Sequence, residues 1–170
     1  MMDQTEGELT SSDKQDVATG RFAVTTSTEA QDAVNKILKY YDESSFGDWR
    51  NTVTFVADDP DEPNEFILQQ TVDLIAQEVE ATRPEFNLKK IYSDAYPQES
   101  TAGGERYPSV NQAIDNAVES GSLVLDYFGH GGVNGWANER ILEVPQVQKW
   151  SNFNTLPLFI TVTCEFARFD

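Results

Sequence analysis

The sequence predicts an α/β fold with an open, mostly parallel β-sheet and helices on both faces. Segments typical of strands alternate with segments typical of helices along most of the chain, and this order is characteristic of parallel sheets with right-handed crossovers. The two most continuous apolar runs are SLVLDYF at 122–128 and TLPLFITVT at 155–163. Runs of this composition are expected for central strands that are covered on both faces.

The chain has the size of one ordinary domain. It contains 170 residues, of which 39% are hydrophobic, so it can bury a core. Residues 1–16 are polar and acidic and show no helical or strand period. We interpret them as a leader or the edge of a fragment, and we expect one domain over residues 17–170.

Charge and the rarest residue types exclude several functions. The chain has 12 basic and 29 acidic residues, a net charge of −17, which argues against nucleic acid as a partner. The N-terminus lacks the pattern of a signal peptide, and no segment approaches the roughly 18 apolar residues needed to span a bilayer. One cysteine, Cys164, and one histidine, His130, allow no internal disulfide and make a zinc site improbable.

The first elements are a short strand and an amphipathic helix. The strand is expected in DVATGRFAV, residues 16–24, and the helix in residues 26–41. Thr26 and Glu29 have the spacing of a capping box at the start of this helix. The apolar stripe consists of Ala30, Ala33, Val34, Ile37, Leu38 and Tyr41.

A second strand and helix follow. NTVTFVA at 51–57 is rich in β-branched residues and stops at the acidic loop DDPDEPNE, residues 58–65. The next helix is predicted to end at the pair Arg83-Pro84, because proline disfavours helical geometry in the residue before it. The apolar positions of this helix are Leu68, Val72, Ile75 and Val79.

The remaining elements lead to the two apolar strands. FNLKKIY at 86–92 predicts a strand, and residues 93–108, rich in Gly, Ser and Pro, predict a long loop. A helix then begins with Ser109 and Gln112 as a second capping box and ends at Gly121. One face of this helix carries Val110, Ala113, Ile114, Ala117 and Val118.

His130 and Cys164 are the residues best suited to nucleophilic chemistry. His130 follows the strand predicted at 122–128, and Cys164 follows the strand predicted at 155–163. Ligands of open parallel sheets bind beyond the carboxyl ends of the strands, so we expect these two positions to converge. A positioned imidazole raises the nucleophilicity of a thiol. The sequence therefore predicts a Cys-His pair.

Glycines and an aromatic residue surround the histidine. Because glycine has no Cβ, the backbone N–H groups of Gly131 and Cys164 are candidates for an oxyanion hole. Trp136 either forms a wall of the site or packs on the loop. The glycine spacing does not match the dinucleotide-binding pattern, and a Rossmann site is rejected.

Each of these features also has an ordinary structural interpretation. A lone cysteine after an apolar strand is often a buried small hydrophobe, and a lone histidine in a glycine-rich turn is often a surface residue. The acidic loop at 58–65 is either solvated, or binds a structural calcium ion, or supplies a carboxylate that orients His130. The equivalent positions of His130 and Cys164 favour catalysis.

Four ordered blocks of the sequence resemble the gingipain-type cysteine peptidases, and most closely the sortase of the type IX secretion system. They are residues 20–41, residues 49–59, YFGHGGVNGWANERIL at 127–142 and LPLFITVTCEFARFD at 156–170. The resemblance extends over residues 17–170. HGG alone is weak evidence, whereas the ordered set of blocks is specific.

The resemblance implies a caspase-like α/β fold, with Cys164 as the nucleophile and His130 as the general base or proton carrier. It implies an extracytoplasmic enzyme at the bacterial outer membrane or cell surface that cleaves the C-terminal sorting domains of exported proteins. Water or an amine on a lipopolysaccharide-linked acceptor then resolves a thioester on Cys164. Other components of the secretion system are expected partners. No cofactor is required, and a structural calcium ion stays open.

The family likeness leaves further points as expectations. Family members are longer, so we expect residues 17–170 to be a catalytic domain truncated at its C-terminal end. Asp59, at the end of the strand predicted at 51–57, is the first candidate for orienting His130, and Asp58 is the second. Two other functions compete with the sortase: a secreted general cysteine peptidase that cuts after Arg or Lys, and a noncatalytic scaffold or binding module.

Overall fold

The computed structural model describes residues 20–166. The chain divides into two units, Met1–Asn35 and Lys36–Asp170. In the first unit, residues 20–24 form no strand, so the strand predicted at 16–24 is wrong over that part, and residues 16–19 lie outside the described range. A strand needs a neighbour for its backbone N–H and C=O groups, and none of the described strands pairs with residues 20–24.

Helix α1 (Ser27–Tyr40) begins where the sequence predicts it. The Thr26 hydroxyl accepts a hydrogen bond from the Glu29 N–H at 3.2 Å. The Glu29 carboxylate in turn accepts one from the Thr26 N–H at 3.3 Å. The predicted capping box is therefore confirmed.

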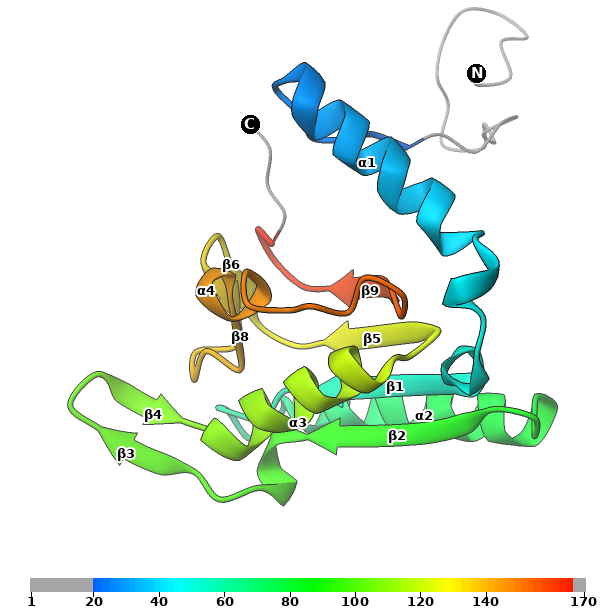
Figure 1. Ribbon diagram of the computed structural model, residues 1–170. Coiled ribbons are helices and arrows are strands. Elements are labelled where there is room, and N and C mark those ends of the chain that lie inside the picture. Colours follow the sequence, from blue (N-terminus) through cyan, green and yellow to red (C-terminus); the bar gives the residue numbers. More distant parts are fainter. Residues whose placement is uncertain (1–19, 167–170) are drawn as a thin grey trace, which may run out of the picture. The chain divides into compact units, whose positions relative to one another are not determined.

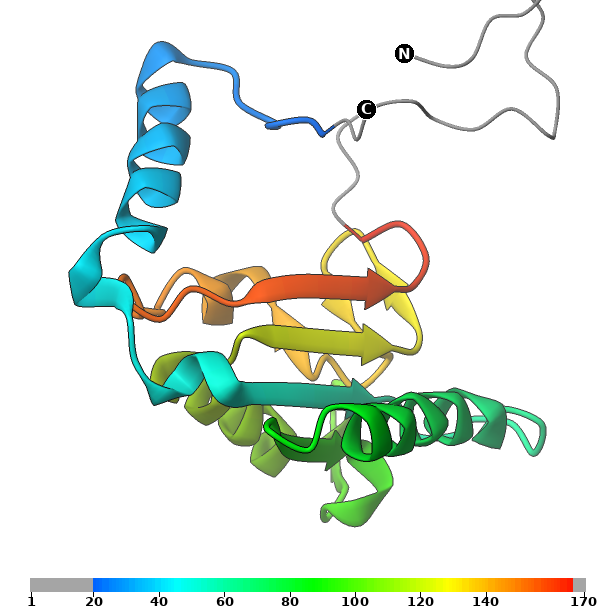
Figure 2. The same ribbon diagram turned by 90° about the vertical axis from the view of Figure 1, so that its right-hand side faces the viewer.

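The second unit is built on a four-stranded sheet with the strand order β2-β1-β5-β9. These strands are β1 (Thr52–Ala57), β2 (Asn87–Tyr92), β5 (Val124–Phe128) and β9 (Leu158–Val162). Every neighbouring pair is parallel, and the arrowheads of β1, β5 and β9 point the same way in Figure 2. The predicted parallel sheet is confirmed.

One long helix covers part of each face of the sheet. Helix α2 (Phe66–Thr82) and helix α3 (Pro108–Ser120) lie on opposite faces, with α3 in front in Figure 1. Strand β1 is buried along its length and contributes alternate residues to the two cores. The core on the α2 face consists of Val53, Phe55, Ala57, Val72 and Ala76. The core on the α3 face includes Val56, Ile91, Val110, Ile114, Val118, Leu125 and Tyr127.

Both long helices end where the sequence predicts. Helix α2 stops before Arg83, whose N–H still bonds the Val79 carbonyl oxygen at 2.7 Å. Helix α3 stops at Gly121, which has a φ of 91°. Glycine adopts this left-handed conformation without the steric cost of a Cβ.

The start of α3 differs from the prediction. Pro108 is in the first turn and Tyr107 is the N-cap residue. Proline suits the first turn because its missing N–H has no helical acceptor there. Ser109 therefore lies inside the helix and Gln112 bonds Asn116, so the capping box predicted at Ser109 and Gln112 is wrong.

Short elements occupy the connections between the strands. Residues 93–108, predicted as a loop, contain a hairpin of two short strands, β3 (Glu99–Thr101) and β4 (Gly104–Arg106). The chain between β5 and β9 forms a small antiparallel sheet and one helical turn. The elements are η1 (Glu43–Ser45), η2 (Asp48–Asn51), η3 (Ser93–Ala95), β3 (Glu99–Thr101), β4 (Gly104–Arg106), β6 (Gly131–Gly132), β7 (Gly135–Trp136), β8 (Leu142–Glu143) and α4 (Val144–Val147).

Strand β9 is an edge strand of the described sheet, which corrects the prediction of a central strand. Leu158, Ile160 and Val162 are 60%, 44% and 50% exposed, whereas Phe159 packs against Trp136 on the other face. An uninterrupted apolar run carries no signal for the number of neighbouring strands.

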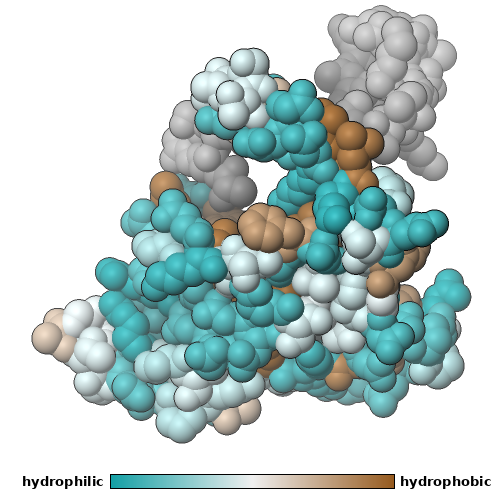
Figure 3. All heavy atoms as spheres, viewed as in Figure 1, coloured by the Kyte–Doolittle hydropathy of each residue, from teal (hydrophilic) through white to brown (hydrophobic). Residues whose placement is uncertain are grey.

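The surface over α3 and the β3–β4 hairpin is largely hydrophilic (Figure 3). This agrees with the excess of 29 acidic over 12 basic residues. Among residues 20–166, none of the helices combines the length and the apolar character that crossing a membrane requires.

Asp126 in β5 is a carboxyl group among apolar side chains. It lines a groove of about 540 Å³ together with Phe55, Ile75, Phe128 and Ile160. Burial raises the pKa of the Asp126 carboxyl above its ordinary value of 3.8. The stability that the protonated Asp126 carboxyl contributes is therefore fully present below pH 3.8, its ordinary pKa. This stability is lost as the pH rises through the higher pKa of the folded state.

Asp126→Asn removes this titration and keeps the shape of the side chain. We expect the free energy of unfolding to rise by about 1 kcal/mol at about pH 7 and to be unchanged at about pH 4. Urea unfolding followed by circular dichroism measures both values. Asp32→Asn, at an exposed carboxylate of α1, is the control, and a gain at Asp126 that is independent of pH contradicts the explanation.

Candidate active site

The carboxyl ends of β5 and β9 converge at one edge of the sheet. The parallel register pairs Phe128 with Val162. Beyond this pair, the Gly129 N–H donates a hydrogen bond to the Val162 carbonyl oxygen at 3.3 Å. His130 and Cys164 each follow the pair by two residues, and Figure 2 shows the segments after β5 and β9 at the same end of the strands.

Gly131 lies against the segment that carries Cys164. A Cβ on Gly131 would collide with the Thr163 hydroxyl and stand 3.2 Å from the Cys164 carbonyl oxygen. Glycine is therefore the residue that fits without displacing this segment. The backbones of Gly131 and Cys164, the two predicted oxyanion-hole residues, are adjacent.

Cys164 is exposed, so it is not the buried small hydrophobe of the structural interpretation. The next residue, Glu165, has a φ of 52°, in the left-handed region that residues with a side chain rarely adopt. The Phe166 N–H bonds the Cys164 carbonyl oxygen at 2.6 Å. This tight turn follows directly after the thiol.

The backbone of His130 is fixed from both sides. Its N–H donates to the Asp58 carboxylate at 2.9 Å. Its carbonyl oxygen accepts hydrogen bonds from the Tyr127 hydroxyl at 2.6 Å and from the Ala137 N–H at 2.8 Å. The side chain is 40% exposed, so the imidazole is held in place and still accessible.

The carboxylate that reaches the imidazole belongs to Glu65. Nε2 of His130 lies 3.1 Å from Oε1 of Glu65. The other oxygen of Glu65 accepts a hydrogen bond from the Glu62 N–H at 2.9 Å. Glu65 is the N-cap residue of α2 and the last residue of the acidic loop. Of the three interpretations of this loop, the contact of Glu65 corresponds to the carboxylate that orients His130.

Asp58 and Asp59, the residues named from the sequence for this task, have other partners. Asp58 accepts its hydrogen bond from the backbone N–H of His130, not from the ring. Asp59 accepts one from the Tyr107 hydroxyl at 2.9 Å. The carboxylate that contacts the imidazole is therefore Glu65 and not Asp59, and its signal in the sequence was its place in the acidic loop at 58–65.

Burial dominates the electrostatics beneath the site. Asp58 is 2% exposed, and burial raises its pKa to about 7, although the hydrogen bond from the His130 N–H favours the ionised form. Burial also raises the pKa of Asp59 and of Glu139 above their ordinary values. The edge of the sheet therefore concentrates carboxyl groups that resist ionisation.

Among residues 20–166, two groups of side chains have the donor atoms to hold a metal ion. In each group, atoms of three residues lie within 4.8 Å of one another. One group includes the imidazole of the candidate base, and the other consists of carboxylates only, the donors that Ca²⁺ prefers. The first is Asp61, Glu65 and His130, and the second is Asp58, Asp59 and Glu139.

Trp136 belongs to the core and not to the wall of a pocket. It is fully buried and stacks on Tyr127, with 4.2 Å between ring centroids and 8° between planes. Phe159 and Phe166 pack against it as well. The pocket-wall interpretation is wrong, because β6 and β7 fold this side chain under the loop that carries His130.

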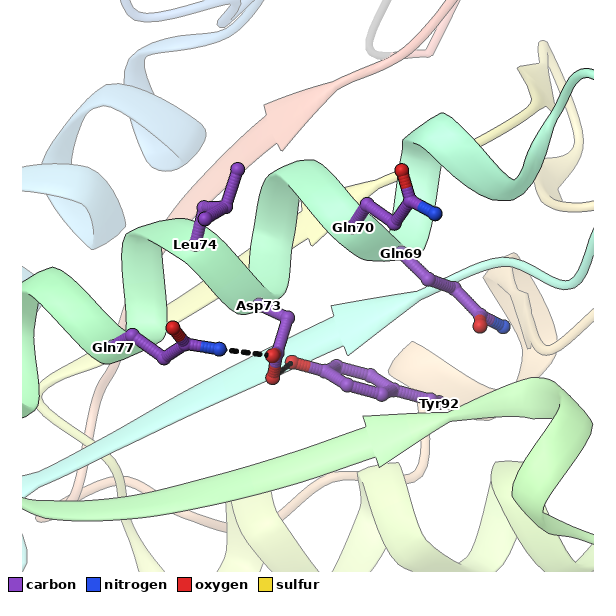
Figure 4. A pocket seen from close by; sticks show the side chains of 6 residues that line it. All are labelled: Gln69, Gln70, Asp73, Leu74, Gln77 and Tyr92. Atoms are coloured by element: carbon purple, nitrogen blue, oxygen red, sulfur yellow. Dashed lines mark hydrogen bonds between the residues drawn. The ribbon is translucent and has the colours of Figure 1, made fainter.

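Two hollows lie in this part of the molecule. One of about 230 Å³ is lined by residues between Gly131 and Glu143, next to His130 in the chain. A larger one of about 530 Å³ lies along α2 and is lined by Gln69, Gln70, Asp73, Leu74, Gln77 and Tyr92 (Figure 4). There the Asp73 carboxylate accepts hydrogen bonds from Gln77 and Tyr92, and neither His130 nor Cys164 takes part. We place the candidate active site at the edge of the sheet.

Known proteins resemble this chain in sequence and in fold. A family model described as peptidase family C25 matches residues 1–170. The crystal structure of the Arg-specific cysteine proteinase gingipain R (RgpB) gives a TM-score of 0.62 at 17% sequence identity. The complex of the RgpB pro- and mature domains of Porphyromonas gingivalis gives the same values. No curated protein matches the chain.

These structural matches confirm the fold class. They cover 83% of this chain but 30% and 31% of the matched chains. The chain therefore spans less than a third of their length. Within that part, the mostly parallel sheet with helices agrees with the caspase-like fold that the family resemblance implies.

The contact between Glu65 and His130 fixes the tautomer of the imidazole. We expect the neutral ring to carry its proton on Nε2 in the native chain, because the Glu65 carboxylate accepts it there. Glu65→Ala should shift the ring toward a mixture of tautomers. Since the chain has one histidine, nitrogen-15 chemical shifts of the ring report this directly. Glu62→Ala, which keeps the backbone donor to Glu65, is the control, and an unchanged tautomer in Glu65→Ala contradicts the assignment.

Proposed function

Because this chain belongs to peptidase family C25, we propose that the carboxyl ends of β5 and β9 carry the active site of a gingipain-type cysteine endopeptidase. Cys164 is the nucleophile and His130 is the proton carrier. The observation that carries this proposal is the convergence of their strand ends, with Phe128 and Val162 in register and Gly131 against the Thr163–Cys164 backbone. The exposure of Cys164 and the Glu65 carboxylate at the His130 ring support it.

Acylation follows from these roles. His130, oriented through Nε2 by Glu65, takes the thiol proton on its other ring nitrogen. The sulfur of Cys164 attacks the carbonyl carbon of a peptide bond, and the N–H groups of Gly131 and Cys164 stabilise the oxyanion. The C–N bond breaks, His130 gives its proton to the leaving amine, and the acyl group stays on sulfur as a thioester.

Deacylation separates the two candidate activities. In a sortase, an amine attacks the thioester and a new amide bond forms, whereas in a hydrolase water attacks and a carboxylic acid forms. The motif resemblance favours a type IX secretion sortase that acts on C-terminal sorting domains, with a lipopolysaccharide-linked amine as acceptor. This role places the enzyme outside the cytoplasm, at the outer membrane or cell surface, together with other components of the secretion system.

A general cysteine peptidase is the second candidate. The observation that favours it is the structural likeness to a proteinase described as Arg-specific. A basic side chain before the scissile bond needs a carboxylate in the primary pocket. A noncatalytic scaffold is the third candidate, and it gives no chemical role to His130 and Cys164 after the paired ends of β5 and β9.

The reactivity of Cys164 tests the catalytic assignment without a substrate. The chain has one cysteine, so iodoacetamide labelling reports on this thiol alone. At about pH 7, we expect His130→Ala to lower the second-order rate constant about tenfold or more, because the imidazole no longer accepts the thiol proton. Val133→Ala, at an exposed residue of the same loop, should keep the native rate.

Equal labelling rates in the native chain and His130→Ala would overturn the Cys-His pair and favour the noncatalytic scaffold. Circular dichroism of each variant ensures that a lower rate does not result from unfolding. Cys164→Ala gives the background of the labelling assay.

Product analysis distinguishes the sortase from the general peptidase. We expect a fusion protein with a C-terminal sorting domain to be cleaved before that domain and, with a primary amine present, to be recovered as an amide adduct by mass spectrometry. Fluorogenic peptides with Arg or Lys before the scissile bond should react at least about a hundredfold more slowly in kcat/KM. Rapid hydrolysis of the basic peptides without an amide adduct contradicts the sortase, and Cys164→Ala controls for contaminating peptidases.

A further inference from the structure

Thr163 connects the segment of the candidate nucleophile with the segment of the candidate base. It is the first residue after β9 and directly precedes Cys164, while Gly131 directly follows His130. A Cβ on Gly131 would stand 2.3 Å from Oγ1 and 3.1 Å from Cγ2 of Thr163. The side chain of Thr163 therefore fills the place that a side chain on Gly131 would occupy.

The exposure of the residues around Thr163 explains the direction of its side chain. Val162 and Cys164 are exposed, whereas Thr163 between them is half-buried. Successive side chains of an extended segment point to opposite faces. The same alternation that exposes the thiol of Cys164 therefore turns the side chain of Thr163 toward Gly131.

The contact between Thr163 and Gly131 is steric and is not a hydrogen bond. Oγ1 of Thr163 is buried and has no hydrogen-bond partner among residues 20–166. A buried hydroxyl without a partner costs stability compared with an apolar group of the same shape. Threonine is branched at Cβ and restricted in χ1, so its two terminal atoms form a stiff spacer. The feature that the fold uses at this position is the shape of the side chain.

Gly131 supplies the space that matches this spacer. It is not among the described glycines that have a positive φ, so its backbone conformation does not require glycine. Glycine is required there by the close approach of Thr163 and of the Cys164 carbonyl oxygen, which would stand 3.2 Å from a Cβ. One contact between a threonine and a glycine thus determines how closely the two segments approach.

We propose that Thr163 is a positioning residue, whose branched side chain sets the distance between the segments of His130 and Cys164 through its contact with Gly131. The inference rests on the proposed function, because the Cys-His pair is what the contact positions. Transfer of the thiol proton requires the imidazole within hydrogen-bond reach of the sulfur. The same contact sets the spacing of the Gly131 and Cys164 N–H groups in the proposed oxyanion hole.

A double-mutant cycle with His130→Ala tests this role in the 170-residue chain. The rate constant of iodoacetamide labelling of Cys164 is measured in the native chain, in each single variant and in the double variant. We expect Thr163→Ala to lower the rate constant about threefold or more, because a small misplacement of a catalytic group has a steep cost. In the His130→Ala background, Thr163→Ala should leave the rate constant unchanged. Altered access to the thiol alone would change both backgrounds by the same factor.

Two single variants separate the shape of Thr163 from its other properties. Thr163→Val keeps both branches on Cβ and should recover most of the rate constant that Thr163→Ala loses. Thr161→Ala makes the same chemical change in β9, at a side chain that is not among the atoms nearest to Gly131. It should label at the native rate.

Alanine at position 131 should reverse the effect of Thr163→Ala. Gly131→Ala places a Cβ against the threonine and pushes the two segments apart, so we expect a rate constant below that of the native chain. Adding Thr163→Ala removes both colliding atoms of the threonine and should raise the rate constant above that of Gly131→Ala. A threonine that only supports the fold would not give opposite signs in the two backgrounds.

The outcomes distinguish the positioning role from the proposed function. Native labelling in Thr163→Ala, with slower labelling in His130→Ala, would overturn the positioning role and leave the Cys-His pair intact. A loss in Thr163→Ala that persists in the His130→Ala background would also overturn the role. Equal labelling of the native chain and His130→Ala would overturn the pair and the role together. Circular dichroism identifies unfolded variants, and Thr163→Ser, which removes only the methyl group, serves if Thr163→Ala does not fold.

Discussion

The chemistry at the edge of the sheet depends on the parallel pairing of β1, β5 and β9. Because the three strands point the same way, the segments after Ala57, Phe128 and Val162 leave the sheet at one place. A slip of one residue in the β5–β9 register would move His130 relative to Cys164 by about 3.3 Å, the length of a hydrogen bond. The apolar core under α3 holds this register by packing Leu125 and Tyr127 of β5 together with Phe159 of β9.

Asp58 fixes the loop that follows β5 against the end of β1. Its buried carboxylate accepts the N–H of His130, and a Cβ on Gly129 would stand 2.5 Å from the Asp58 Cβ, so the first turn after β5 is packed against the end of β1. The same packing has an electrostatic cost. It removes Asp58 from water, raises its pKa to about 7 and brings it close to Glu139. The position of His130 and the excess of buried carboxylates have one structural origin.

Local sequence patterns were sufficient to predict the strands, the long helices and the shared edge that carries His130 and Cys164. Hydrophobic periodicity and helix-end residues determine these features over short stretches of sequence. They were insufficient where the outcome depends on the path of a loop. Glu65, not Asp59, reaches the imidazole, and the Glu62 N–H of the same loop holds its other oxygen. Trp136 is buried because two very short strands fold it inward, and nothing in an apolar run marks β9 as an edge strand.

The reaction develops its charge beside a cluster of carboxyl groups. Attack of a thiolate on a peptide carbonyl develops negative charge on oxygen, and backbone N–H groups at Gly131 and Cys164 supply only partial positive charge. Several carboxylates of residues 58–65, together with Glu139, lie near this edge in a chain of net charge −17. Burial limits the negative charge near the oxyanion, because it raises the pKa of Asp58, Asp59 and Glu139 and so favours their neutral forms. The Glu65 carboxylate lies beside the His130 ring, where negative charge stabilises the imidazolium that forms when the ring takes the thiol proton.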